Sequence, residues 1–302
     1  MITPKYLKKG DKIGIVAPAR KVSMEELSPS IKIMQQWGLE VVLGKNVFNE
    51  NNQFSGTDNE RVADIQTMLD DSTVKAVIAA RGGYGTIRII DHIDFHNFSK
   101  FPKWIVGYSD TTVLHAHIHR NLGIETIHAT MPINFLKSKG AVESLRKALF
   151  GEKLIYKQEN LLYSPLQRQG SCEGVLIGGN LSLICALAGS NADINTHGKI
   201  LFLEDLDEYL YHIDRMMQNL KRSGKLINLA GLIIGGMTEM KDNKIAFGKT
   251  AEEIIMENVK EFNYPVCFGF PAGHIDQNMA LILGRKIELN VSQKLTSLFF
   301  QA

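Results

Sequence analysis

Short apolar segments rich in β-branched residues alternate with capped helical segments over the first third of the chain. This alternation limits the fold more than any other feature. Strands are predicted at residues 12–19, 39–43, 75–80 and 103–108. Helices are predicted after the capping boxes Ser23-Met-Glu-Glu26 and Thr57-Asp-Asn-Glu60, and Gly38 is placed to end the first of them. Strands that alternate with helices indicate a parallel sheet with helices on both faces, and such sheets bind ligands at the carboxyl ends of their strands.

The second half of the chain has a different pattern. Strands are predicted at 200–203, 230–235 and 266–270, with helical stretches at 181–188 and 214–220. Residues 138–169 are polar and irregular, which is typical of a connection between domains. A length of 302 residues suits two domains of ordinary size. We therefore expect a first domain over 1–135, a connection over 136–170 and a second domain over 171–302.

Composition restricts the class of partner. Lys plus Arg number 34 and Asp plus Glu 32, so the net charge of +2 gives no electrostatic reason to expect nucleic acid or a membrane surface. A small molecule or a peptide is the expected ligand. The three cysteines are widely spaced and predict reduced thiols in the core, with neither a disulfide framework nor a zinc site. The first residues lack the pattern of a secretory leader and no apolar run is long enough to span a bilayer, so a cytoplasmic protein is expected.

Two loops follow predicted parallel strands, and the second of them contains Ser109. This serine lies between a buried strand and a predicted helix, the setting of a nucleophile elbow, where a sharp turn exposes the hydroxyl. Amides at the start of that helix could stabilise an oxyanion. The structural alternative is a serine that only caps the helix. Thr111 replaces the second glycine of the hydrolase elbow pattern, so the motif gives no support for an α/β-hydrolase fold.

The other loop is Arg81-Gly-Gly-Tyr-Gly85. Its three glycines allow bare backbone to approach a ligand or to offer amide donors. The alternative is a tight connection between strand and helix. The loop lacks the Lys-Ser/Thr pair of a phosphate loop and the spacing of a dinucleotide fingerprint, so no nucleotide cofactor is predicted.

A nucleophilic serine needs a general base, and the base needs an acidic partner that holds its tautomer. His274 follows Pro271-Ala-Gly273 at a strand end and is the best-placed base, although a solvated loop histidine is the alternative. Glu204 follows the apolar run 201–203 and is the candidate acid, with a solvated acidic turn as the alternative. His115 and His119 lie one helical turn apart, as metal ligands can, but no acidic residue accompanies them and packed helix histidines are favoured. No metal site is predicted.

Several segments together resemble the LD-carboxypeptidase family, which includes muramoyltetrapeptide carboxypeptidases and microcin C immunity peptidases. They fall in the family's order and cover nearly the whole chain: Gly10–Pro18, Arg81–Gly85, Val106–Asp110, Gly178–Leu181, Leu201–Asp205, Ile213–Met216 and Gly273-His274. The resemblance implies a flavodoxin-like N-terminal domain with a parallel sheet and a C-terminal, β-rich α/β domain. It also implies a homodimer. No cofactor is predicted.

The same resemblance implies a catalytic triad of Ser109 as nucleophile, Glu204 as acid and His274 as base. The oxyanion hole is expected from the backbone amides of Asp110 and Gly83, with Gly85 as the weaker alternative. The implied substrate is a muropeptide that loses its terminal D-alanine during cell-wall recycling, and Arg81 is the candidate partner of a substrate carboxylate. Two alternatives remain: an immunity-type hydrolase of peptidyl or aminoacyl adenylates, and a non-catalytic sensor that binds muropeptides.

Overall fold

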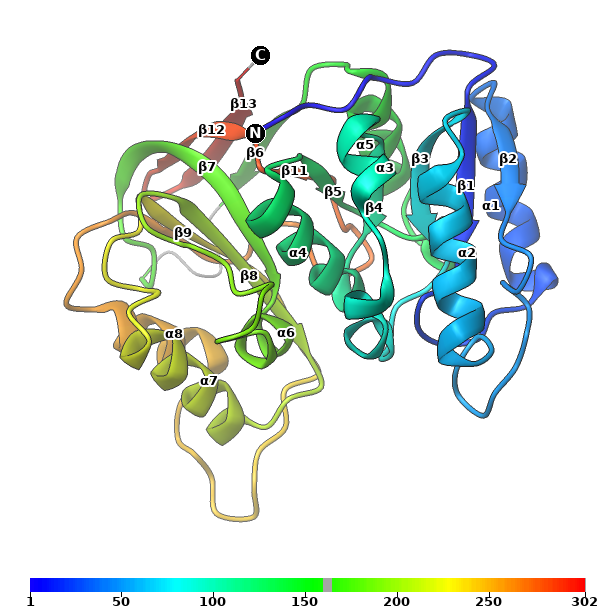
Figure 1. The fold of residues 1–302 in the computed structure, drawn as a ribbon. Coiled ribbons are helices and arrows are strands. Elements are labelled where there is room, and N and C mark those ends of the chain that lie inside the picture. Colours follow the sequence, from blue (N-terminus) through cyan, green and yellow to red (C-terminus); the bar gives the residue numbers. More distant parts are fainter. Residues whose placement is uncertain (160–164, 302) are drawn as a thin grey trace.

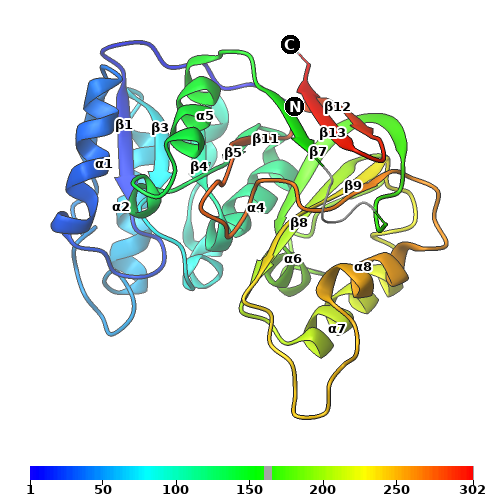
Figure 2. The same ribbon diagram turned by 180° about the vertical axis from the view of Figure 1, so that it is seen from behind.

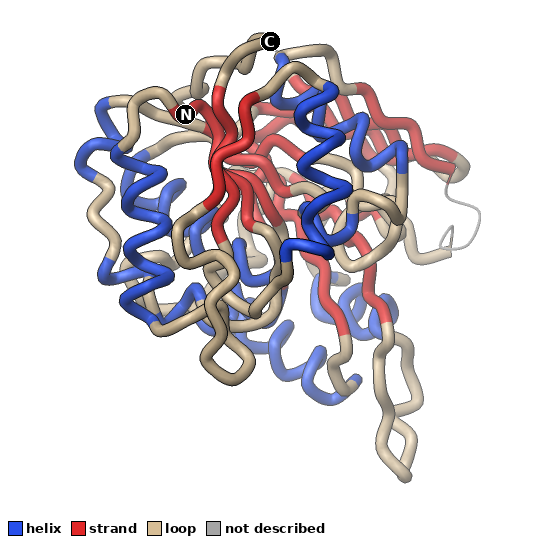
Figure 3. Tube along the Cα trace, turned by 90° about the vertical axis from the view of Figure 1, so that its right-hand side faces the viewer, coloured by secondary structure: helices blue, strands red, loops and turns tan. Residues whose placement is uncertain are grey.

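The structure, a computed structural model, describes residues 1–159 and 165–301. It contains a six-stranded sheet and a seven-stranded sheet, each accompanied by helices (Figure 1). Seen from the side, the strands form a central layer with helices packed against them (Figure 3). Among the described residues, no helix is both long enough and apolar enough to cross a membrane.

The first sheet is the parallel sheet that the alternation predicts. Its strands are β1 (Lys12–Val16), β2 (Glu40–Leu43), β3 (Val74–Ala79), β4 (Trp104–Gly107) and β5 (Thr126–His128). They pair in parallel in the order β2-β1-β3-β4-β5. This is the strand order of flavodoxin-like folds, so the expected architecture of the N-terminal half is confirmed.

Helices cover both faces of this sheet. Helices α1 (Met24–Gln36) and α5 (Lys139–Phe150) pack on one face, and α2 (Asp58–Asp70), α3 (His96–Lys100) and α4 (Thr112–Leu122) pack on the other. Both predicted capping boxes form: Ser23 caps α1 with Glu26, and Thr57 caps α2 with Glu60. Each box satisfies backbone donors that the first helical turn would otherwise leave unpaired.

The second sheet is mixed and makes the C-terminal half rich in strands, as expected. Strands β7 (Gly170–Asn180), β8 (Ile200–Leu206), β9 (Gly231–Thr238) and β10 (Val266–Cys267) run in parallel. Strands β12 (Lys286–Val291), β13 (Leu295–Phe300) and β6 (Ile155–Glu159) extend the other edge in antiparallel fashion. Helices α6 (Leu181–Ala186), α7 (Leu210–Arg222) and α8 (Ala251–Val259) belong to this half (Figure 2).

The two halves share their cores. Strand β11 (Leu281–Leu283) comes from the C-terminal part of the sequence but pairs antiparallel with β5, at the edge of the first sheet. One buried cluster joins the α4 face of the first sheet to β7, β8 and α7, and a second joins the opposite face to β8 and β9. The carboxyl ends of β4 and β8 are therefore held against each other by continuous packing.

The expectation that residues 138–169 are irregular is wrong for part of that stretch. Helix α5 occupies 139–150, with Ser138 as its N-cap and Gly151 in a left-handed conformation at its C-cap. Val142, Leu145 and Leu149 repeat at helical spacing and are buried, so the signal is present in the sequence despite its polar setting. Strand β6 follows at 155–159. The domain limits of 1–135 and 171–302 stay a prediction.

Candidate active site

Ser109 lies in a strained turn at the carboxyl end of β4. Its φ is 59°, in the left-handed region that residues other than glycine rarely adopt. A short 3-10 turn over Ser109–Thr111 leads from this point into α4. Gly82, on the neighbouring loop, leaves room for it, because a Cβ there would lie 3.0 Å from the Ser109 Cβ and 3.1 Å from its Oγ. The turn therefore holds the serine hydroxyl away from its own helix and toward the space between the two halves.

Glu204 and His274 meet at the end of the second sheet. Glu204 is the fifth residue of β8 and is fully buried. Its Oε2 accepts hydrogen bonds from the backbone N–H of His274 at 3.1 Å and from Nδ1 of the same ring at 2.6 Å. This close approach requires Gly273, which has a φ of 104° and whose Cβ would lie 2.6 Å from the Glu204 Cβ.

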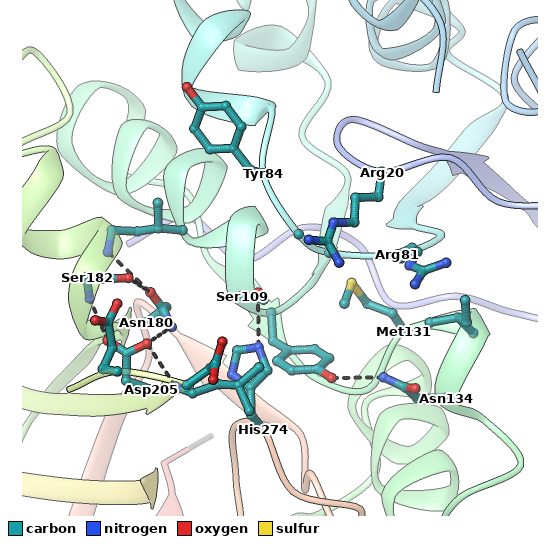
Figure 4. A pocket seen from close by; sticks show the side chains of 18 residues that line it. Arg20, Arg81, Tyr84, Ser109, Met131, Asn134, Asn180, Ser182, Asp205 and His274 are labelled. Atoms are coloured by element: carbon teal, nitrogen blue, oxygen red, sulfur yellow. Dashed lines mark hydrogen bonds between the residues drawn. The ribbon is translucent and has the colours of Figure 1, made fainter. Parts of the chain in front are cut away.

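The His274 ring also reaches Ser109. Nε2 lies 3.1 Å from the serine Oγ, as the dashed line in Figure 4 marks. A carboxylate can only accept, so Nδ1 carries the proton of the neutral ring, and Nε2 is left to accept from the serine hydroxyl. The structure thus brings together the three residues that the sequence nominated, in the order serine, histidine and glutamate. That order is the one required for a histidine to remove the hydroxyl proton.

The surroundings of His274 favour its charged form. Burial by itself lowers the pKa of this imidazole, but the charge and hydrogen bond of Glu204 outweigh burial, so the pKa is raised above the ordinary value of 6.5. The ring of Tyr108 lies edge-on to the imidazole, with 4.9 Å between the ring centroids. Its phenol oxygen accepts a hydrogen bond from the Asn134 amide at 2.8 Å. These contacts restrict rotation of the imidazole away from Ser109.

A pocket of about 590 Å³ opens beside the serine and is lined by both halves of the chain. Arg20 and Arg81 lie on one side of Ser109 in Figure 4, and Asn180, Ser182 and Asp205 lie on the other. The pocket is therefore cationic on the N-terminal side and acidic on the C-terminal side. A ligand that carries a carboxylate near its cleavage site has one favourable orientation in such a pocket.

The two arginines differ in their partners. The Arg81 guanidinium lies 3.6 Å from the Glu26 carboxylate and donates to the Lys21 carbonyl at 3.5 Å. The side chain of Arg20 lies over Gly83, and its guanidinium forms no ion pair or hydrogen bond with any residue that the structure describes. Both arginines face the pocket, but Arg20 is the freer donor.

The acidic side of the pocket is built around Asp205. Its carboxylate accepts from the Asn180 amide and from the Ser182 backbone N–H, both at 2.9 Å. Burial, and secondly the charge of the neighbouring Glu204, raises the pKa of Asp205 to about 7. Asp205 therefore ties the start of α6 to the end of β8, beside Glu204.

The glycines of the Arg81–Gly85 loop take different positions. Gly83 is exposed and lines the pocket together with Gly82 and Ser109. Gly85 is buried, and its backbone amide helps to stabilise the carboxylate of Asp110. Of the two glycines, only Gly83 presents backbone to the pocket.

The histidine pair on α4 is packed inside the protein. His115 Nε2 lies 2.9 Å from the Gly107 carbonyl oxygen, and His119 Nε2 lies 2.9 Å from the Thr126 hydroxyl. Burial lowers the pKa of both rings, to about 4 for His115. Each ring thus braces a strand end beside α4, and this agrees with the packed alternative.

Comparison with known proteins gives the family. The family model for the LD-carboxypeptidase N-terminal domain matches residues 13–129, and that for the C-terminal domain matches residues 173–289. The chain belongs to the LD-carboxypeptidase family. It is a serine-type carboxypeptidase, a hydrolase, which argues against a non-catalytic sensor.

Several relatives of this LD-carboxypeptidase match nearly its whole length. It is 37% identical over 297 residues to a probable murein peptide carboxypeptidase of Bacillus subtilis, which covers 96% of this chain and 92% of that protein. It is also similar to the crystal structure of muramoyltetrapeptide carboxypeptidase from Oxalobacter formigenes, with a TM-score of 0.86, 26% identity, and coverage of 96% and 99%. The microcin C7 self-immunity protein MccF superposes with a TM-score of 0.88 at 22% identity, over 100% of this chain and 99% of that one, and shares the fold.

Sequence reasoning missed several residues of the LD-carboxypeptidase pocket, among them Arg20, Asn180 and Asp205. Arg20 follows the strand predicted at 12–19, and Asn180 ends the Gly178-Gly-Asn segment. Both stand where parallel strands end, so the rule that pointed to residues 81–85 and 107–110 also covers them. Asp205 gives no separate signal in the sequence, because its acidic neighbours make the segment resemble a solvated turn.

Proposed function

We propose that this LD-carboxypeptidase hydrolyses the bond between the L-centre of a diamino acid and the terminal D-alanine of a murein tetrapeptide. The observation that carries the proposal is the hydrogen-bonded chain Ser109–His274–Glu204 beside a pocket with a free guanidinium. The names of the relatives, murein peptide carboxypeptidase and muramoyltetrapeptide carboxypeptidase, support the substrate class.

In the proposed reaction His274 removes the Ser109 proton through Nε2 as Oγ attacks the peptide carbonyl carbon. The backbone amides of Asp110 and Gly83 stabilise the resulting oxyanion. His274 then gives the proton to the departing D-alanine nitrogen, and water releases the acyl group from Ser109 in a second attack through the same base. Glu204 keeps the ring in the productive tautomer and stabilises its charged form, so no proton needs to move to the carboxylate.

In this scheme the substrate carboxylate determines how the substrate is oriented in the pocket. A carboxypeptidase must accept a free terminal carboxylate close to the bond it cuts. Arg20 and Arg81 lie on one side of Ser109, and a guanidinium matches a carboxylate with two parallel hydrogen bonds. We assign the carboxylate of D-alanine to these arginines, with Arg20 as the main partner because Arg81 is already braced by Glu26. The rest of the peptide then extends toward Asp205.

A second candidate substrate is a peptidyl or aminoacyl adenylate. Tyr84 favours it, because this ring lines the pocket, is 46% exposed and has a tilted contact with Phe54 at 6.2 Å between centroids. An exposed aromatic face at a pocket edge can stack on a purine base.

One assay separates these substrates. Purified protein is incubated with a murein tetrapeptide that ends in D-alanine, with the same peptide ending in L-alanine, and with a non-hydrolysable aminoacyl sulfamoyl adenosine as competitor. We expect loss of one alanine, by mass spectrometry, from the D-alanine peptide alone. Cleavage of neither peptide, with tight binding of the nucleotide analogue, would move the assignment to the adenylate substrate.

We further propose that the protein acts in the cytoplasm as a homodimer in cell-wall recycling. These points rest on the family resemblance. Light scattering coupled to size-exclusion chromatography tests the dimer, and a mass of one chain would contradict it. Cell fractionation tests the location, and muropeptide accumulation in a deletion strain tests the recycling role.

A further inference from the structure

The two proposed oxyanion donors come from different loops. Gly83 follows β3 and Asp110 follows β4, and the loops are separate excursions from neighbouring strands. An oxyanion hole works only when both amides point at the same position, and a displacement of about 1 Å can cost roughly 100-fold in rate. Some contact must therefore fix one loop against the other.

The side chain of Asp110 makes that contact. Its Oδ2 accepts from the backbone N–H of Thr86 at 2.8 Å and from the Thr86 hydroxyl at 2.5 Å. Asp110 is 1% exposed and Thr86 is fully buried. Thr86 directly follows the loop of Gly83 and Gly85, so the carboxylate holds the end of that loop.

Other residues pack against the opposite side of the Arg81–Gly85 loop. The buried Arg61 guanidinium donates to the Pro18 carbonyl at 2.5 Å and pairs with Asp58. A Cβ on Gly85 would lie 2.6 Å from Arg61 Nη1 and 3.0 Å from the Pro18 oxygen. Gly85 therefore lies between Arg61 and Asp110, and the loop over Arg81–Gly85 has little room to move as a unit.

The carboxylate cannot exchange these partners for water. A buried carboxylate without hydrogen bonds is costly, so the Thr86 donors and the Asp110 side chain constrain each other. Asp110 thus contributes to the site through two separate groups. Its backbone amide is one proposed oxyanion donor, and its side chain anchors the loop that carries the other.

We propose that the Asp110 carboxylate and the Thr86 hydroxyl form a positioning pair that sets the distance between the two oxyanion donors. This inference rests on the proposed function, because it concerns the same nucleophile. Thr86 acts through the loop and touches no substrate. Its loss should therefore slow the chemical step and leave substrate binding unchanged.

The test compares Thr86→Val, which removes the hydroxyl, with Thr86→Ser, which keeps it. Thr196→Val is the matched control, because it removes another buried threonine hydroxyl, which donates to the Lys225 carbonyl at 2.7 Å and does not line the pocket. Each variant is assayed for kcat and KM on the tetrapeptide and for its rate of reaction with a serine-directed fluorophosphonate. Circular dichroism checks the fold, and Thr86→Ala replaces Thr86→Val if the latter does not fold.

We expect Thr86→Val to lower kcat and the labelling rate about tenfold with KM unchanged, which is less than the loss of a whole oxyanion donor. Thr86→Ser and Thr196→Val should stay within about twofold of the wild type. Equal rates for Thr86→Val and Thr196→Val, or a rise in KM alone, would contradict the proposed pair. A wild type that labels but leaves the tetrapeptide intact refutes the proposed substrate only, since the labelling series still measures the pair. A wild type that does neither refutes the proposed function, and the inference with it.

Discussion

At the scale of single residues, the account depends on the proton that His274 must accept. The neutral ring is the base, so kcat/KM should fall as the pH falls through the pKa of His274 in the free enzyme. That pKa is raised above 6.5 chiefly because Glu204 outweighs the opposite effect of burial. We therefore expect an acidic limb with its midpoint above 6.5 in the wild type.

Glu204→Gln should move that limb. Removing the charge takes away the largest contribution that raises the pKa of His274, while burial still lowers it, so this pKa should fall and the midpoint should shift to lower pH. The rate at the plateau should drop by a factor on the order of 10⁴, because glutamine no longer enforces the productive tautomer. A pH–rate profile of kcat/KM for both proteins measures the shift. An unmoved midpoint would mean that another group controls the limb.

The arginines make a second prediction at this scale. Arg20→Ala should lower kcat/KM by roughly 10- to 100-fold, the loss of a hydrogen-bonded charge pair, and Arg81→Ala should lower it less. A substrate whose terminal carboxylate is converted to an amide should already be poor for the wild type and should lose little more in Arg20→Ala. Arg222→Ala, at the exposed end of α7, serves as control. Equal losses on the acid and the amide would place the carboxylate elsewhere.

At the scale of elements, the site depends on the close contact of β7 and β8. Gly178 pairs with Phe202 across these strands and has a φ of 128°. A Cβ there would lie 1.9 Å from the Phe202 backbone oxygen, two residues before Glu204. Gly178→Ala should therefore lower the free energy of unfolding by roughly 3 kcal/mol or more, through overpacking and backbone strain.

Gly198→Ala is the matched control for that change. Gly198 also has a positive φ, 67°, but a Cβ there meets nothing within 4 Å. It should cost about 1 kcal/mol from strain alone. Urea denaturation of the two variants measures the difference, and equal losses would show that the strand contact is looser than described.

The elements also show how much of the fold and of the site can be predicted from the sequence. The positions of the strands and the helix starts in the first half follow from local signals, such as the β-branched run before Ala17 and the capping boxes at Ser23 and Thr57. Ser109, Glu204 and His274 could be nominated because each follows a predicted strand, but their mutual distances depend on packing between the halves. The pairing of β11 with β5 is a contact between residues about 150 positions apart, and no local pattern encodes it.

At the scale of the whole molecule, several buried histidines make stability depend on pH. Burial lowers the pKa of His115 to about 4 and those of His119 and His128 well below 6.5. The neutral rings contribute to stability above about pH 6.5, where the histidines of the unfolded chain are neutral too. This contribution is lost as the pH falls toward 4. Asp205 has the opposite effect on stability. Burial raises its pKa to about 7, so its contribution is lost as the pH rises.

His115→Gln isolates one histidine in this balance. Glutamine can still donate toward the Gly107 carbonyl but does not titrate. The slope of the unfolding free energy against pH between about 4.5 and 6 should therefore be smaller in the variant, by up to about 1.4 kcal/mol per pH unit. Urea titrations at several pH values give both slopes. Identical slopes would mean that His115 already titrates normally in the folded protein.

The measurement that tests the central claim most directly is the release of D-alanine from a murein tetrapeptide by the wild type and by Ser109→Ala. The account predicts release by the wild type and a rate lower by a factor on the order of 10⁶ for the variant, with an unchanged circular dichroism spectrum. Release by Ser109→Ala within about tenfold of the wild type would contradict Ser109 as nucleophile and, with it, the proposed mechanism.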